Sequence, residues 1–341
     1  MPVASMDLFI ASATIIIIVI VAMGGLNFLA EPYIGGDISH RERYQQIVRS
    51  VLLSPGEPRG WGVGGVPTAL GFSSGGRIYE LDFDEVTRLN PSNFHALNYL
   101  QLWKALGVDD VSFRIRVTPL FNLTLKLESR VVDDENTTYR FSASTMRDGY
   151  PLAAQIRYYI IAVNFTDTGL GATNNEGSGS TEFTLPNSLN GTVLLLGMAR
   201  MEPMIVTYYV MPFSQNSTPP HVLGAYVKMS PLNYTLEVDL ISGATVVGAY
   251  AFTFNYMFKL NEADGTYSIP RLLDDSPIIL VLTGTNGTSE WAEWTAYPQV
   301  PLTVGAEMTG SGSISGVTAV QYVVEIRGVL YRFEMELEGP T

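Results

Sequence analysis

The chain has 341 residues, a formal net charge of −13 and 46% hydrophobic residues. This negative charge, with only four lysines among the 20 basic residues, argues against a nucleic-acid partner and against a polybasic membrane anchor, because both need a basic surface. It contains no cysteine, so disulfides, thiolate metal sites and a cysteine nucleophile are excluded.

The first predicted element is an uncharged apolar run over residues 8–30, which is 23 residues long. A helix of about 20 apolar residues can cross a bilayer. No Lys or Arg precedes the run, and it is longer than the roughly 7–15 apolar residues of a cleaved signal peptide. We therefore expect a retained hydrophobic helix within residues 1–36, which is either a membrane anchor or the core of a filament.

A block of isoleucines in this run has small residues on either side of it. Small residues let apolar helices approach closely, whereas a lone anchor needs only hydrophobicity. The pattern predicts helix–helix contact as well as, or instead of, lipid contact, and an ordinary anchor is the alternative. The residues expected in this contact are Ile15, Ile16, Ile17, Ile18, Ile20, Ala22, Gly24 and Gly25.

Two further helices are predicted before residue 107. Apolar residues spaced for one helix face predict a helix over 41–53, which Ser54-Pro55-Gly56 ends. Residues 55–76 are a glycine-rich loop. The next helix is expected to run from Ser92, as its N-cap, to Leu106, with Gly107 as the stop.

From residue 110 onward the apolar period changes to two, as in Phe113, Ile115 and Val117, which is typical of antiparallel sheets with one wet face. Strands are expected near 112–117, 123–127, 139–145, 155–164, 181–185, 191–199, 203–213, 233–241, 246–259, 277–284 and 317–337. The Gly/Ser/Asn stretch 169–180 predicts a domain boundary. The expected fold is mainly β with an N-terminal transmembrane-type helix: an α+β neck domain over 37–168, followed by an antiparallel β-sandwich over 169–341.

A weak internal repeat links residues 182–199 with 266–285, since both read as a strand, a proline, a polar turn and an apolar strand. This pattern indicates either two related halves of a sandwich or convergent hairpin patterning.

Seven asparagines lie in the acceptor motif N-x-[ST], and all of them follow the apolar run. This excess predicts a glycosylated domain outside the cell, and Ser/Thr-rich turn chemistry is the alternative. The positive-inside rule would place the domain in the cytoplasm, because Arg41, Arg43 and Arg49 follow the apolar run. These arginines begin ten residues beyond the run, so we give the acceptor motifs more weight. The expected glycan sites are Asn122, Asn136, Asn164, Asn190, Asn216, Asn233 and Asn286.

Two motifs suggest chemistry only weakly. Residues 71–75 match G-x-S-x-G around Ser73, but no strand precedes them and no helix follows, as a nucleophile elbow requires. Residues 60–65 match G-x-G-x-x-G, but they lack the flanking strand and helix that a dinucleotide-binding site requires. Trp61 is instead expected to pack this loop onto the helices. The chain is predicted to have no catalytic site and no cofactor.

Acidic clusters and an aromatic stripe complete the candidates. The clusters 82–85, 133–135 and 274–275 do not match an EF-hand calcium loop and are interpreted as solvated turns, with structural Ca²⁺ as the alternative, and no metal site is predicted. The stripe is predicted to lie on one face of a single strand, either in the core or exposed as a binding surface. Its members are Tyr250, Phe252, Phe254, Tyr256 and Phe258.

A series of short motifs resembles a pattern in archaeal membrane-anchored surface proteins, some of them called pilin-like. The motifs are IVRSVLLSPGEP (47–58), Trp61, ALGF (69–72), YELD (79–82), Leu106-Gly107 and VSFRI (111–115). The resemblance covers about residues 8–127 and implies a hydrophobic N-terminal helix with a domain outside the cytoplasm. The chain lacks the basic leader and the processing site of true type IV pilins, although Asp7 lies where pilins place an acidic residue.

These observations predict a structural cell-surface glycoprotein, a pilin-like filament or cell-envelope subunit that assembles through its hydrophobic helix. Its expected partners are other copies of the chain, the membrane and covalent N-glycans. The alternative is a membrane-anchored extracellular module that binds sugar or peptide on an aromatic β-surface.

Overall fold

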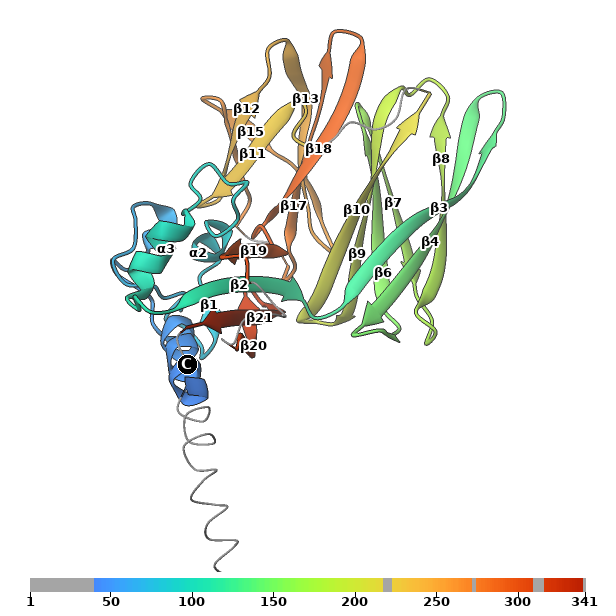
Figure 1. Cartoon of the computed structure of the whole chain (residues 1–341). Coiled ribbons are helices and arrows are strands. Elements are labelled where there is room, and N and C mark those ends of the chain that lie inside the picture. Colours follow the sequence, from blue (N-terminus) through green and yellow to red (C-terminus); the bar gives the residue numbers. More distant parts are fainter. Residues whose placement is uncertain (1–39, 217–222, 272–273, 309–315, 340–341) are drawn as a thin grey trace, which may run out of the picture.

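The computed structural model describes residues 40–216, 223–271, 274–308 and 316–339 (Figure 1). The predicted hydrophobic helix, with Ile15 to Ile18, Ile20, Ala22, Gly24 and Gly25, lies outside the described residues. Within the described ranges, no helix is long and apolar enough to cross a membrane. Strands dominate these ranges, so the mainly β fold class is confirmed.

Both ends of the described chain build one unit, which we call the neck (residues 40–119 and 300–339). Its five-stranded sheet has the order β1-β20-β21-β2-β19, and β1 runs parallel to β20 whereas the other pairs are antiparallel. The strand bounds are β1 (Glu80–Leu81), β2 (Ser112–Pro119), β19 (Leu302–Gly305), β20 (Thr318–Ile326) and β21 (Val329–Glu338). Helix 40–53, η1 (Trp61–Val63), α2 (Phe83–Thr87) and α3 (Tyr99–Leu106) pack against the sheet.

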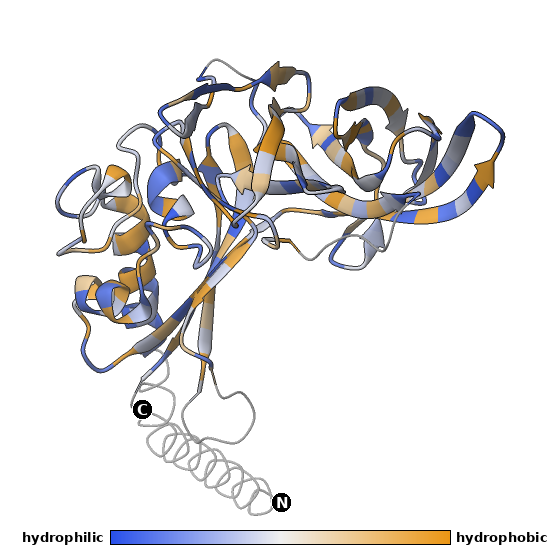
Figure 2. Cartoon of the chain, turned by 90° about the horizontal axis from the view of Figure 1, so that it is seen from above, coloured by the Kyte–Doolittle hydropathy of each residue, from blue (hydrophilic) through white to orange (hydrophobic). Residues whose placement is uncertain are grey.

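Alternation along β2 and β21 explains the two faces of the neck sheet. Phe113, Ile115 and Val117 enter the core beneath the helices. Arg116 lies on the other face, where its guanidinium bonds Glu334 at 2.9 Å across the strand pair. Figure 2 shows the same alternation of hydrophobic and hydrophilic residues along the long strands. One face is therefore apolar and covered, while the other is held by ion pairs.

Residues 122–215 form a first β-sandwich, sandwich I. In its outer sheet β3 and β8 flank β4, with β5 beside the end of β4, and its inner sheet has the order β10-β9-β6-β7. The bounds are β3 (Asn122–Val132), β4 (Asn136–Arg147), β5 (Tyr150–Pro151), β6 (Gln155–Ala162), β7 (Phe165–Ala172), β8 (Ser178–Pro186), β9 (Gly191–Glu202) and β10 (Ile205–Gln215).

Residues 227–297 form sandwich II. Its outer sheet has the order β11-β12-β16-β15, and its inner sheet has the order β14-β13-β17-β18. The bounds are β11 (Val227–Leu232), β12 (Thr235–Leu240), β13 (Ala244–Phe252), β14 (Met257–Lys259), β15 (Asn261–Ala263), β16 (Thr266–Ser268), β17 (Ile278–Asn286) and β18 (Ser289–Tyr297).

The two sandwiches share one topology. In chain order β3, β4, β6, β7, β8, β9 and β10 correspond to β11, β12, β13, β14, β16, β17 and β18, with the same neighbours in both sheets. The repeat predicted between 182–199 and 266–285 covers β8–β9 and β16–β17, which occupy equivalent places. The structure therefore relates two whole sandwiches rather than two halves of one.

The inner sheets of the two sandwiches pack face to face and bury a fourth core cluster between them. Leu194 and Leu196 of β9 meet Ile279 and Val281 of β17 there, while Val193 and Leu195 point into sandwich I. This burial on both faces explains the continuous apolar runs of β9 and β17. The result is a four-layered body beyond the neck (Figure 1).

The sheets also divide the chain differently from the predicted domains. The boundary predicted at residues 168–169 falls inside β7, which pairs with β6. Strands β19 to β21, from the predicted sandwich, complete the neck sheet with β2. Both sandwiches are thus inserted between two strands of the neck, an arrangement that only long-range pairing specifies.

Some predicted elements were wrong in extent. The stretch 317–337 is a hairpin of β20 and β21, turned by Arg327 and Gly328 at positive φ. The stretch 246–259 is β13 and β14, separated by a turn in which Thr253 N donates to Tyr256 O.

The third helix begins at Tyr99, because Asn98 rather than Ser92 forms its capping box with Gln101. The helix predicted over 41–53 is confirmed, with residues 40–53 helical.

Candidate functional site

The G-x-S-x-G segment begins in the neck core, with Gly71 and Phe72 buried, and reaches the surface at Ser74 and Gly75. Ser73 N donates to Ser54 O at 2.9 Å, and Ser73 Oγ accepts from Gly75 N at 3.2 Å. Of the histidines in the described ranges, His95 faces Glu237 at 3.2 Å and His40 lies beside Tyr44. Neither histidine bonds Ser73, so the described part of the chain does not assemble a nucleophile with a base.

The G-x-G-x-x-G loop is held by buried side chains. Trp61 is fully buried, and its Nε1 donates to Gly71 O at 3.0 Å. The Arg88 guanidinium lies over the Trp61 ring and donates to the carbonyl oxygens of Trp61, Gly65 and His95. The prediction that Trp61 packs this loop onto the helices is confirmed.

The first acidic cluster was predicted to be a solvated turn, and this prediction is wrong, because Asp84 and Glu85 are buried. Asp82 caps α2 by accepting from the backbone N–H groups of Asp84 and Glu85. The Glu85 side chain is buried, and its Oε2 has no hydrogen-bond partner among the described residues. Burial, with the nearby Asp82 and Asp84 charges, raises the pKa of Glu85 to about 9. Glu85 is therefore a neutral acid at pH 7.

Asp84 joins the neck to sandwich II. Its buried carboxylate accepts from Tyr297 Oη at 2.6 Å and from Asn233 N at 2.9 Å. Phe83 packs edge-on against both Tyr234 and Tyr297. Burial raises the pKa of Asp84, and the two donors oppose that rise. This cluster fixes the position of sandwich II on α2.

The other two acidic clusters differ from each other: residues 133–135 are exposed, as predicted for a solvated turn, whereas Asp274 is half-buried and hydrogen-bonded. Asp133 Oδ1 accepts from the backbone of Glu135 and Asn136 in the β3–β4 turn. Asp274 accepts from Asn255 and Ser276, and lies 3.4 Å from the Arg200 guanidinium. Within the residues that the structure describes, no group of three or more acidic or histidine side chains could hold a metal ion.

The predicted aromatic stripe does not lie on one strand. Tyr250 and Phe252 belong to β13, and the turn at 253–256 separates them from Phe258 on β14. Phe252 and Phe254 are buried between the sandwiches, whereas Tyr256 is exposed. The turn breaks the alternation, so the five rings do not form one binding surface.

The seven predicted glycan sites all lie at the surface. Asn122, Asn164, Asn190, Asn216 and Asn233 are exposed, and Asn136 and Asn286 are half-buried. Strand register places Asn136, Asn164, Asn190 and Asn216 at one end of sandwich I, and Asn286 lies at the β17–β18 turn. Figure 1 shows these strand ends on the side of the sandwiches away from helix 40–53. Asn122 and Asn233 lie near the neck.

Left-handed turns account for part of the asparagine pattern. Asn164, Asn216 and Asn233 have φ of 56°, 50° and 46°, a conformation that asparagine tolerates better than most residues. The Nδ2 group of Asn216 also donates to Asn187 O at 2.7 Å. Turn geometry explains the asparagine at these three positions, but it does not explain the Ser or Thr two residues later.

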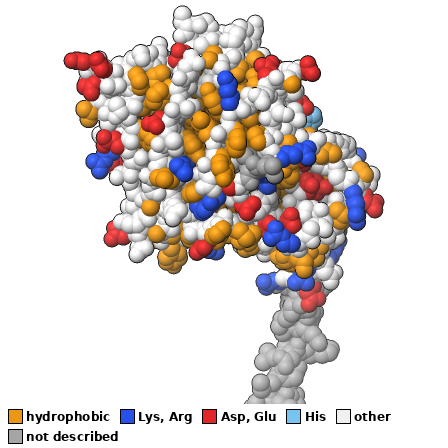
Figure 3. All heavy atoms as spheres, turned by 180° about the vertical axis from the view of Figure 1, so that it is seen from behind, with side chains coloured by type: hydrophobic (Ala, Val, Ile, Leu, Met, Phe, Trp, Pro, Cys, Tyr) orange, Lys and Arg blue, Asp and Glu red, His pale blue; other side chains and the backbone are white. Residues whose placement is uncertain are grey.

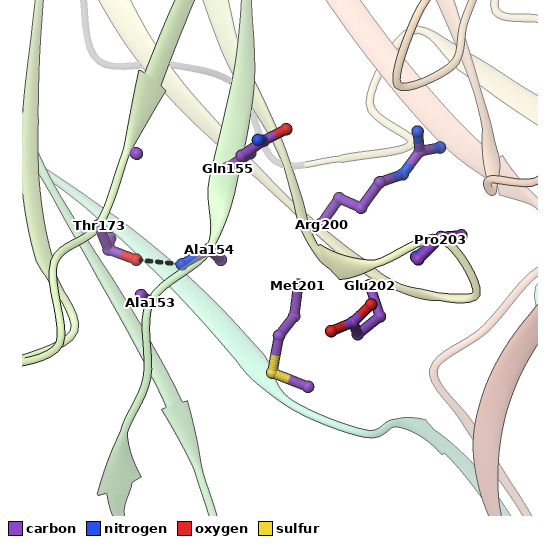
Figure 4. Close-up of a pocket in the computed structure, with 9 residues that line it drawn as sticks. Ala153, Ala154, Gln155, Thr173, Arg200, Met201, Glu202 and Pro203 are labelled. Carbon is purple, nitrogen blue, oxygen red and sulfur yellow. Dashed lines mark hydrogen bonds between the residues drawn. The ribbon is translucent and has the colours of Figure 1, made fainter.

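One cavity of about 450 Å³ lies at the end of sandwich I nearer the neck. Figure 4 shows Arg200 turned away from Met201 and Glu202, which lie below the strand. The Arg200 guanidinium stacks 4.1 Å from the Phe254 ring centroid and bonds Asp274, so its charge is already engaged. Thr173 Oγ1 accepts from Ala154 N at 3.0 Å. The lining offers no paired acid and base.

A larger cavity of about 600 Å³ lies where the neck meets sandwich II. The neck loop 91–94 forms one wall, and residues of β11, β12 and β18 form the others. The sequence reasoning missed this site. The signal was the short segment SEWAEWTAY (289–297), an amphipathic strand with two tryptophans that was not predicted as a strand.

No protein-family model matches the chain, and no curated protein matches its sequence. The fold places the chain in a broad class, the mainly β proteins built from stacked sheets.

Proposed function

We propose that this chain is a structural glycoprotein of the cell surface, which assembles with other copies through its hydrophobic segment 8–30. The observation that carries the proposal is the position of the seven acceptor asparagines. Five of the seven are exposed and two are half-buried, and five lie in turns or at strand ends at the end of the sandwiches away from helix 40–53 (Figure 1). Glycans there would leave the neck and the segment before it free for assembly or anchoring.

The charge distribution supports a role without nucleic acid. The rear face of the molecule carries apolar side chains over the sandwiches, with basic and acidic side chains scattered around them (Figure 3). Several arginines are also engaged by carboxylates, as in Arg43–Asp110 at 2.7 Å and Arg332–Asp148 at 2.9 Å. Scattered, paired cations do not make the continuous basic patch that a phosphate backbone needs.

Glycosylation is the first test. We expect mass spectrometry of peptides from the native protein to find glycans on several acceptor asparagines, including Asn164, Asn190 and Asn286. Asn216 is expected to be the least occupied, because its Nδ2 group already donates to two carbonyl oxygens. Fully unmodified Asn122, Asn190 and Asn286 would contradict a glycosylated, extracellular domain.

Assembly is the second test. Replacing Ala22, Gly24 and Gly25 with leucine keeps the segment apolar but blocks close approach of helices. We expect electron microscopy to show ordered filaments or lattices for the native protein and at least a tenfold loss of them for this variant. The matched control is Val19→Leu with Val21→Leu and Met23→Leu, which makes as many substitutions to leucine in the same run but keeps the small residues and the isoleucines. If the first variant assembles like its parent, the segment is only an anchor.

A further inference from the structure

The cavity between the neck and sandwich II has walls that are already fixed. The buried Glu293 carboxylate accepts from Gly224 N and Tyr226 N at 2.6 Å each, which holds the chain entering β11 against β18. On the neck side, Asn93 Nδ2 donates to Pro231 O and to Gln299 Oε1. A cavity whose polar framework is satisfied can bind a ligand without reorganising.

Two charged side chains face this cavity without engaging each other. Lys228 on β11 lies directly opposite Asp239 on β12, and both residues are exposed. Neither side chain makes an ion pair or a hydrogen bond within the part of the chain that the structure describes. Their charges cancel, so together they offer an ammonium donor and a carboxylate acceptor to a ligand with no net charge.

One exposed aromatic side chain supplies the apolar part of the lining. Phe94 is 42% exposed, and its backbone N–H is fixed by Ser230 Oγ at 2.7 Å. Trp294 also borders the cavity, but its ring packs against Tyr208 in the core cluster between the sandwiches. The residues Ser92 and Thr295, which carry hydroxyl groups, also line the cavity. A flat apolar ring beside donors and acceptors complements a sugar ring, which has an apolar face and a hydroxylated rim.

We propose that this cavity is a binding site for a neutral saccharide. The pyranose ring stacks on the aromatic lining, while the Asp239 carboxylate accepts from its hydroxyl groups and the Lys228 ammonium donates to them. This activity goes beyond the structural role proposed above and does not depend on filament formation. It also differs from the aromatic surface at residues 250–258, because it uses other side chains.

The test uses the full-length protein in a detergent that contains no sugar. The probes are the methyl glycosides of glucose, galactose, mannose and N-acetylglucosamine at millimolar concentration, followed by saturation-transfer NMR and titration. We expect at least one glycoside to bind. Phe94→Ala and Asp239→Asn are each expected to raise its Kd at least tenfold, because the first removes the ring contact and the second replaces a charged carboxylate acceptor with a neutral amide.

Matched controls separate this site from general surface effects. Tyr256→Ala removes an exposed ring, and Glu262→Gln neutralises an exposed carboxylate on the opposite edge strand of the same sheet. Both controls should bind like the parent. The proposal is overturned if none of the four glycosides binds, if the controls weaken binding as much, or if free leucine binds in their place, since that would indicate a zwitterion site.

Discussion

Replacing Trp61 with alanine is expected to lower the free energy of unfolding by about 3–5 kcal/mol, the usual cost of removing a large buried aromatic side chain. Trp61 is fully buried in the neck core, beside Phe72 at 5.9 Å between ring centroids. Its loss would also leave Gly71 O without its indole donor and remove the ring under Arg88. Chemical denaturation of the parent and the variant measures this change.

Val63 provides the matched control, because it lies in the same 3-10 turn but is 56% exposed. Val63→Ala should change stability by no more than about 0.5 kcal/mol, as is usual for surface substitutions. If Trp61→Ala and Val63→Ala were equally mild, the glycine-rich loop would not be part of the folded core.

Glu85→Gln is expected to stabilise the protein at alkaline pH while leaving it unchanged near pH 4. Burial raises the pKa of Glu85 from 4.5 to about 9 in the folded protein. Between these values the unfolded chain releases the proton that the folded protein keeps, so stability falls as pH rises from about 4.5 to about 9. Glutamine stays neutral, so the variant should lack this loss, which is on the order of a few kcal/mol.

The measurement is the free energy of unfolding at intervals from pH 4 to pH 9.5. The difference between Glu85→Gln and its parent should be near zero at pH 4 and should grow steadily up to about pH 9. Asp134→Asn is the control, because Asp134 is exposed in the β3–β4 turn. A pH-independent difference for Glu85→Gln would mean that the Glu85 carboxyl is ionised in the folded protein.

Local patterns in the sequence specified several elements correctly. The helix over 40–53 follows from apolar residues at helical spacing, and β2 and β21 follow from strict alternation. The Arg327-Gly328 turn that divides 317–337 was readable in principle, because a two-residue turn at positive φ favours glycine. The start of α3 could not be predicted from local sequence. Asn93 hydrogen-bonds to Pro231 and Gln299, and these long-range contacts hold residues 90–97 in turns.

What the sequence by itself determined is the mainly β character and the surface position of the seven acceptor asparagines, since both follow from residues close together in the chain. Only the tertiary structure decided that β2 pairs with β21, that two sandwiches of one topology stack through their inner sheets, and that Phe94 and Trp294 line one cavity. Pairing between strands some 200 residues apart depends on which apolar faces fit together, and alternation alone does not encode that choice.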